Sequence, residues 1–275
     1  MDLGLTLLLL LVSAAAGFLG AMLGLGGGIV IVPALTLLFG RDIHEAIGAS
    51  IVSVIATSTS AAIVYIREGY VDIRLGLLLG LATVVGAPIG GFLGVWMSPR
   101  PLETLFGVML LYTAYSMARA GNIEPSSQEH PEDDPDAVRF VDKASGRTHC
   151  YRPRAVGVGA CTSLGAGFMS GMLGIGGGFI NVPVMHLIMG VPIKAAIATS
   201  NYMIGITGAA SAMIYHSRGF VKPLIVAPCA IGVLVGAQIG SRVASKVHSE
   251  VLRWAFVVLI IVISAQMFRK GIGAG

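Results

Sequence analysis

Charge is scarce in this sequence. Charged residues make up 12% of its 275 residues and hydrophobic residues 55%, whereas a soluble domain carries about 25% charged residues. The long apolar runs lack the alternation of apolar and polar residues that marks a membrane β-barrel. The composition therefore excludes an ordinary soluble domain. It predicts an all-α polytopic protein that spans a lipid bilayer several times.

Cysteine is also rare, and its spacing excludes two kinds of site. Cys150, Cys161 and Cys229 form no CxxC or Cys/His pattern, so neither a disulfide framework nor a metal site is expected. The net charge of +4 does not indicate a nucleic-acid partner, because membrane proteins carry Lys and Arg in their loops. The sequence shows no catalytic triad, phosphate-loop lysine or paired carboxylates. We therefore expect no enzymatic activity and no cofactor.

Ionisable side chains are absent from the interior of the predicted spans. In the first half, spans are expected at Leu3–Leu23, Ala46–Ile66, Leu75–Met97 and Leu102–Ala118, with a shorter helix over Ile29–Phe39. Ionisable residues inside a membrane normally mark proton relays and ion pathways. A carrier of cations is expected to place a carboxylate there, so the scarcity favours a different solute.

Glycine, by contrast, is abundant and gathers in two motifs. Gly24–Gly28 reads G-L-G-G-G and Gly174–Gly178 reads G-I-G-G-G, and each is followed five residues later by a proline, Pro33 or Pro183. Each glycine costs a helix interior about 1 kcal/mol relative to alanine, so we expect the helix to stop in both places. A broken backbone at membrane depth is tolerated only where it is buried in protein or lines a wet cavity.

The two motifs belong to an internal duplication with a constant offset of 150 positions. Further pairs at this offset are Gly17 and Gly167, Ser50 and Ser200, Thr57 and Thr207, Tyr65 and Tyr215, and Gly90 and Gly240. A constant offset over several elements indicates two homologous repeats. We expect each repeat to contain four helices and one short helix broken by glycine. Duplicated halves of this kind are typical of secondary transporters, and we expect them to be inverted.

The repeats are predicted at residues 1–118 and 155–275, with a hydrophilic linker at residues 119–154. The linker holds half of the 14 acidic residues and is interpreted as a solvated spacer. A small hairpin is expected within it, over Val138–Tyr151.

Hydrogen-bond donors near the broken helices suggest an anion site. Helix N-termini carry unpaired N–H groups and a partial positive charge, which suits an anion. The candidate solute-binding residues are Gly26, Gly27, Gly28, Ser50, Gly176, Gly177, Gly178, Asn181, Thr199, Ser200, Asn201 and Gln238. The alternative for the side chains is helix–helix bonding or bonding to the preceding turn.

Other glycines recur every four residues, in the series Gly86, Gly90 and Gly94 and the series Gly232, Gly236 and Gly240. This spacing lines one helix face with small residues, and we interpret these six as packing positions.

The duplicated motifs resemble those of the sulfite exporter TauE/SafE family. The resemblance rests on both G-x-G-G-G motifs with their prolines, on the Ala-x-x-x-Ser pattern at Ala46–Ser50 and Ala196–Ser200, and on the Gly-Ala-x-Ile-Gly runs at Gly86–Gly90 and Gly236–Gly240. It implies a multi-pass protein of the inner (plasma) membrane that transports sulfite, thiosulfate or organosulfonates.

The residues and the resemblance together predict a secondary transporter of a small sulfur oxoanion or sulfonate. A membrane scaffold or accessory subunit without transport, and a passive anion channel, are the alternatives. The identity of the anion, the direction of transport, the coupling ion and the association into homo-oligomers stay open.

Overall fold

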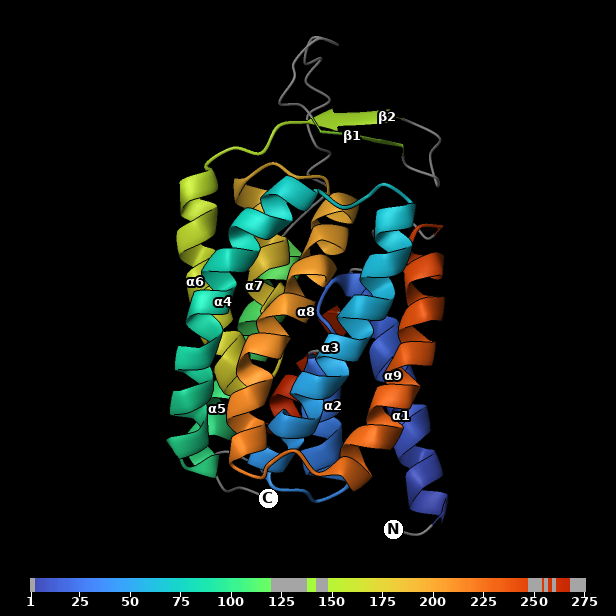
Figure 1. Cartoon of the computed structure of the whole chain (residues 1–275), viewed down its shortest axis with the longest axis vertical. Coiled ribbons are helices and arrows are strands. Elements are labelled where there is room, and N and C mark those ends of the chain that lie inside the picture. The colour runs from blue at the N-terminus through green and yellow to red at the C-terminus, as the bar shows by residue number, and fades with distance from the viewer. Residues whose placement is uncertain are drawn as a thin grey trace.

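The computed structural model describes residues 3–119, 138–141, 148–246, 254, 257–258 and 261–267. Long helices stand side by side in a bundle, with a strand pair at one end (Figure 1). The first half comprises α1 (Leu3–Leu23), α2 (Gly28–Pro33), the π-helical turn η1 (Ala34–Leu38), α3 (Ile43–Arg67), α4 (Ile73–Trp96) and α5 (Pro99–Arg119). The second half comprises α6 (Val156–Leu173), α7 (Gly178–Pro183), η2 (Val184–Ile188), α8 (Ile193–Ser217) and α9 (Pro223–Ala244).

Five of the described helices, α1, α3, α4, α6 and α9, are long and apolar enough to cross a membrane. Large apolar side chains such as Leu11 and Leu81 are exposed on their outer faces, as a lipid-facing surface requires. The prediction of an all-α multi-pass membrane protein is confirmed. One carboxylate does lie within a predicted span. Glu103 falls in the span predicted at Leu102–Ala118, near the start of α5, and is only 7% exposed.

The predicted helix breaks are also confirmed. α1 ends at Leu23 and α2 begins at Gly28, and the same interruption separates α6 from α7 in the second half. The chain then folds back against α1. Gly27 comes so close to α1 that an added methyl group would lie 2.9 Å from the carbonyl oxygen of Ala16. Each break is followed by an 11-residue helical segment, Gly28–Leu38 or Gly178–Ile188.

The largest helix–helix interfaces join the two halves of the sequence. α1 packs along α9, and α4 packs along α6. The glycine series lie at these interfaces, since a methyl group on Gly90 would overlap the carbonyl oxygen of Phe168, and one on Gly240 would overlap that of Phe18. The packing interpretation of the six glycines is therefore confirmed, and the two repeats interlock.

The predicted hairpin is confirmed as β1 (Val138–Val141) paired antiparallel with β2 (Thr148–Tyr151), with Val138 opposite Tyr151. Linker residues 120–137 and 142–147 lie outside the described residues. The prediction that the linker is a solvated spacer therefore stays a prediction for most of its length. The end of β2 is not solvated, because Tyr151 is only 4% exposed.

Candidate functional site

The two glycine motifs adopt the same unusual backbone. Gly24, Gly26 and Gly27 have φ angles of 72°, 73° and 78°, and their counterparts Gly174, Gly176 and Gly177 have 69°, 96° and 74°. Such angles lie in the left-handed region, which only glycine adopts without strain. Both motifs thus form tight turns that end one helix and start the next.

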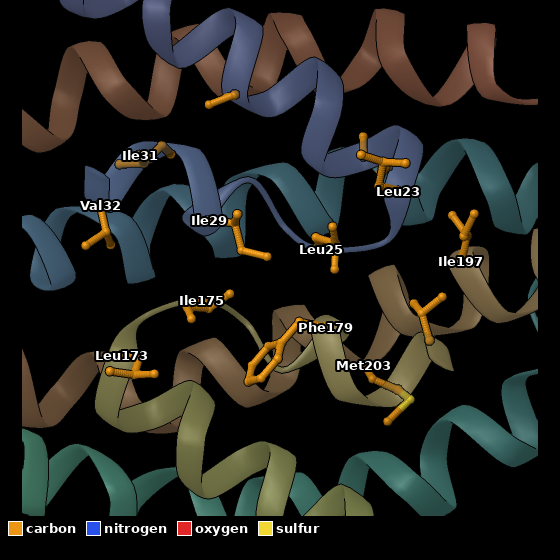
Figure 2. Packing of buried hydrophobic residues seen from close by; sticks show 14 of the residues in the cluster. Leu23, Leu25, Ile29, Ile31, Val32, Leu173, Ile175, Phe179, Ile197 and Met203 are labelled. Atoms are coloured by element: carbon orange, nitrogen blue, oxygen red, sulfur yellow. The ribbon is translucent and has the colours of Figure 1, made fainter. Parts of the chain in front are cut away.

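The two turns pack directly against each other. A methyl group on Gly28 would overlap the carbonyl oxygen of Gly174, and one on Gly178 would overlap that of Gly24. Figure 2 shows the loops facing each other, with Leu25 and Ile29 of the first directed toward Ile175 and Phe179 of the second. We call Gly24–Gly28 together with Gly174–Gly178 the glycine crossing. All of its residues are buried.

Two serines tie the crossing together. Ser50 in α3 donates from its hydroxyl to the carbonyl oxygen of Gly174 at 2.7 Å. Ser200, its counterpart in α8, donates to the carbonyl oxygen of Gly24 at 2.8 Å. Each serine therefore holds the turn of the other repeat, and the contact is reciprocal.

Further carbonyl groups at the ends of α1 and α6 also receive side-chain donors. The hydroxyl of Tyr65 and the amide Nδ2 of Asn201 both donate to the carbonyl oxygen of Ala21, each at 3.0 Å. In the second repeat the hydroxyl of Tyr215 donates to the carbonyl oxygen of Met172 at 3.0 Å. The negative ends of these two helices are thus partly neutralised.

The amide groups at the starts of α2 and α7 are left open. Val30 and Ile31 donate their N–H groups to the carbonyl oxygen of Gly27, whereas the N–H groups of Gly28 and Ile29 have no acceptor among the described residues. The N–H groups of Gly178 and Phe179 are open in the same way within the described chain. The open amides therefore lie beside the carbonyl oxygens of Gly24 and Gly174, which already accept serine hydroxyls.

Val54 in α3 and Ile204 in α8 close the crossing. These two positions are also related by the offset of 150, and both side chains are almost fully buried. A methyl group on Gly26 would lie 2.9 Å from Val54 and 3.1 Å from Ile204, and one on Gly176 would be equally close to both. The Val54 and Ile204 side chains therefore pack against both turns.

The structure brings most of the predicted site residues to the crossing. The six glycines, Ser50, Ser200 and Asn201 lie in it or bond to its turns. The hydroxyl protons of the two serines are committed to carbonyl oxygens. Their contribution in this structure is therefore to satisfy acceptors next to the open amides.

Asn181, Thr199 and Gln238 have other partners. Asn181 in α7 is buried and accepts a hydrogen bond from Ser163 at 3.0 Å. Thr199 accepts the backbone N–H of Asp72 at 3.0 Å, which places its hydroxyl at the α3–α4 connection. Gln238 accepts from Arg242 on the same helix at 3.1 Å.

The hairpin reaches the same connection. The hydroxyl of Tyr151 donates to Oδ2 of Asp72 at 3.4 Å, while Oδ1 of Asp72 caps α4 by accepting the N–H of Leu75 at 2.9 Å. Burial, and then the nearby Asp72 carboxylate, raise the pKa of Tyr151. The phenol thus keeps its proton and remains a donor.

His186 in η2 is a packed histidine and is only 7% exposed. Its Nδ1 lies 2.9 Å from the carbonyl oxygen of Val191.

The sequence reasoning missed Val54, Ile204 and the capping role of Tyr65 and Tyr215. An aliphatic side chain in an apolar helix gives no signal of its own. The only available signal was the offset of 150, which relates Val54 to Ile204 as it relates Tyr65 to Tyr215.

Comparison with known proteins identifies the family. A profile of the sulfite exporter TauE/SafE family matches residues 9–267. The chain belongs to this family. The predicted resemblance is confirmed, and the TauE/SafE fold described here is that of a multi-pass membrane transporter.

Curated relatives agree with this assignment. The chain is 29% identical over 276 residues to the probable membrane transporter protein YunE of Bacillus subtilis, covering 96% of this chain and 98% of the relative. It is 28% identical to the probable membrane transporter protein YdhB of the same organism, covering 84% and 87%. It is 27% identical to the probable membrane transporter protein MJ0441 of Methanocaldococcus jannaschii, covering 78% and 74%. No solved structure matches the chain.

Proposed function

We propose that this TauE/SafE protein is a secondary transporter that moves a small sulfur oxoanion or organosulfonate, such as sulfite or thiosulfate, across the plasma membrane. The anion binds at the glycine crossing, where it accepts hydrogen bonds from the open N–H groups of α2 and α7. The observation that carries the proposal is that N–H groups at two buried helix starts are open, while the nearby carbonyl oxygens of Gly24 and Gly174 accept serine hydroxyls. The family name, sulfite exporter, supports the choice of solute.

This arrangement favours an anion over a cation. A cation requires oxygen ligands, but the carbonyl oxygens of Gly24, Gly174, Ala21 and Met172 already accept side-chain hydrogen bonds. The described residues contain no group of three or more His, Cys, Asp or Glu side chains that could hold a metal ion. An anion needs only N–H donors and a favourable dipole, and the starts of two helices supply both.

We infer that the two repeats are inverted. The start of α1 lies at one end of the bundle, and the hairpin that precedes the second repeat lies at the opposite end (Figure 1). The first repeat thus begins on one side and ends on the other, which is what an inverted pair requires. We expect the solute to be exposed alternately to the two sides when Val54 and Ile204 part.

Flux into vesicles tests the proposal. The purified chain is reconstituted into liposomes, and the uptake of labelled sulfite is compared with uptake into empty liposomes. Uptake that saturates with concentration and is lost in the Gly27→Leu and Gly177→Leu variants supports transport at the crossing. Uptake without saturation identifies a channel. If neither uptake nor binding of sulfite, thiosulfate or a sulfonate is detected, the proposal is refuted and a scaffold or accessory subunit is favoured.

A further inference from the structure

The amide of Asn201 holds an oxygen that nothing in the described chain satisfies. Asn201 is fully buried in α8, and its Oδ1 has no hydrogen-bond partner among the described residues. A buried acceptor without a donor is unfavourable, because it has given up its hydrogen bonds to water. Such an atom calls for a specific explanation.

The orientation of this amide is fixed by its other end. Nδ2 donates to the carbonyl oxygen of Ala21 at 3.0 Å and to that of Ile197 at 3.1 Å. If the amide were turned over, Oδ1 would face two carbonyl oxygens, and neither contact could be a hydrogen bond. The unsatisfied atom is therefore the oxygen.

Asn201 also lies beside the glycine crossing. Ile197 and Ile204 stand one turn before and one turn after it on the same stripe of α8. Backbone atoms of Ile197 lie 3.0 Å from where a methyl group on Gly24 would be, and Ile204 packs against Gly26 and Gly176. Asn201 thus occupies the stretch of α8 between these contacts.

The position breaks the symmetry of the repeats. The residue 150 positions earlier is Ile51, which has no polar group. The first repeat therefore has no side-chain acceptor at the position equivalent to Asn201. An arrangement of this kind suits a solute with two different ends.

We propose that Oδ1 of Asn201 accepts a hydrogen bond from the bound solute, so that the site selects anions that carry an O–H or N–H donor of their own. This inference rests on the proposed function, since it assumes that an anion binds at the open amides. Such solutes include a protonated oxoanion and a sulfonate with a hydroxyl or ammonium group. An anion without a donor leaves Oδ1 unsatisfied and binds more weakly.

A matched pair of solutes tests the inference. 2-Hydroxyethanesulfonate and 1-propanesulfonate have the same charge and nearly the same size, but only the first carries an O–H donor. Binding to the purified full-length protein is measured by calorimetry. We expect the wild type to bind the hydroxyl compound about tenfold more tightly, and Asn201→Leu and Asn201→Ile to bind the two equally.

Ser211→Ala is the matched control. Ser211 is a buried residue of the same helix, and within the described part of the chain its hydroxyl bonds only to the carbonyl oxygens of Thr207 and Gly208 in α8. This variant should keep the tenfold preference.

Equal affinities of the wild type for the two sulfonates overturn the inference and leave the proposed function intact, with a buried water as the partner of Oδ1. A preference that persists in the Asn201 variants also overturns it. If the Asn201 variants do not fold, the wild-type comparison decides alone. If neither sulfonate nor sulfite binds the wild type, the proposed function itself fails.

Discussion

At the scale of single residues, Ser50 and Ser200 have a role that their chemistry alone does not reveal. A serine in a membrane helix usually bonds to the preceding turn of its own helix, as Ser58 does with the carbonyl oxygen of Val54 at 2.7 Å. Ser50 and Ser200 instead reach a glycine carbonyl in the other repeat. They hold the two turns in register and remove acceptors from the vicinity of the open amides.

We predict that Ser50→Ala and Ser200→Ala each weaken sulfite binding by about 1–3 kcal/mol, because a buried carbonyl oxygen loses its donor and then repels the anion. Calorimetry on the purified variants measures the change. Ser58→Ala is the control and should retain wild-type affinity. Wild-type affinity in both Ser50→Ala and Ser200→Ala would show that the carbonyls do not face the solute.

We also predict that Gly178→Ala disrupts the crossing, because the added methyl group would overlap the carbonyl oxygen of Gly24. Overpacking of this kind costs about 1–3 kcal/mol, and the turns must separate to relieve it. The variant should lose sulfite uptake in liposomes and unfold at a lower temperature. Gly165→Ala is a suitable control, since nothing lies within 4 Å of the position where its methyl group would be.

At the scale of elements, glycine acts in two ways that the sequence already separates. Consecutive glycines interrupt a helix, whereas glycines four residues apart let two helices approach closely. Both roles followed from the spacing, and both are observed. The spacing could not predict which helices meet. α4 contacts α6 and α1 contacts α9 because side chains far apart in the sequence fit together, and local patterns do not carry that information.

We predict that Gly90→Ala and Gly236→Ala destabilise the protein by about 1–3 kcal/mol each, since both methyl groups would press on a neighbouring helix backbone. Thermal unfolding in detergent measures the effect. Gly157→Ala in α6, which has open space around it, should unfold at or above the wild-type temperature. Unchanged stability of both interface variants would contradict the packing seen here.

The hairpin is a second element that could be predicted from the sequence although its contacts could not. The strand pair was predicted, yet the bond from Tyr151 to Asp72 was not, because Asp72 lies 79 residues away in the sequence. The charge of the linker predicted a segment exposed to solvent. The buried ring of Tyr151 instead anchors β2 to the α3–α4 connection.

This anchor predicts a dependence on alkaline pH. Because the folded state raises the pKa of Tyr151, its contribution to stability is complete below the ordinary tyrosine pKa of about 10. The contribution is lost as the pH rises above that value toward the raised pKa. Thermal unfolding of the wild type and of Tyr151→Phe should therefore converge at high pH, with the wild type more stable by about 0.5–1.5 kcal/mol at neutral pH. Parallel curves for the two proteins over the whole pH range would refute the anchor.

At the scale of the whole molecule, the repeats are not separate bodies. The first helix of each repeat packs against the fourth helix of the other: α1 lies against α9, and α6 lies against α4. The duplication and the positions of the breaks could be predicted from the sequence, because two glycine motifs recur at a constant offset of 150 positions. The crossing of the two turns could not be predicted, because it depends on the contact between the repeats.

We predict that residues 1–118 and 155–275, produced as two separate chains in the same cell, purify together. The interfaces of α1 with α9 and of α4 with α6 should hold them without the linker. Affinity purification through a tag on one chain, followed by detection of the other, tests this. Gly236→Leu in the second chain should reduce the recovery of its partner. Recovery of either chain alone as a monodisperse protein would contradict the interlocked arrangement.

The paired serine bonds have a consequence for how such a protein could open. Because Ser50 of the first repeat holds the turn of the second, and Ser200 of the second repeat holds that of the first, any movement that separates the repeats at the crossing has to break both bonds.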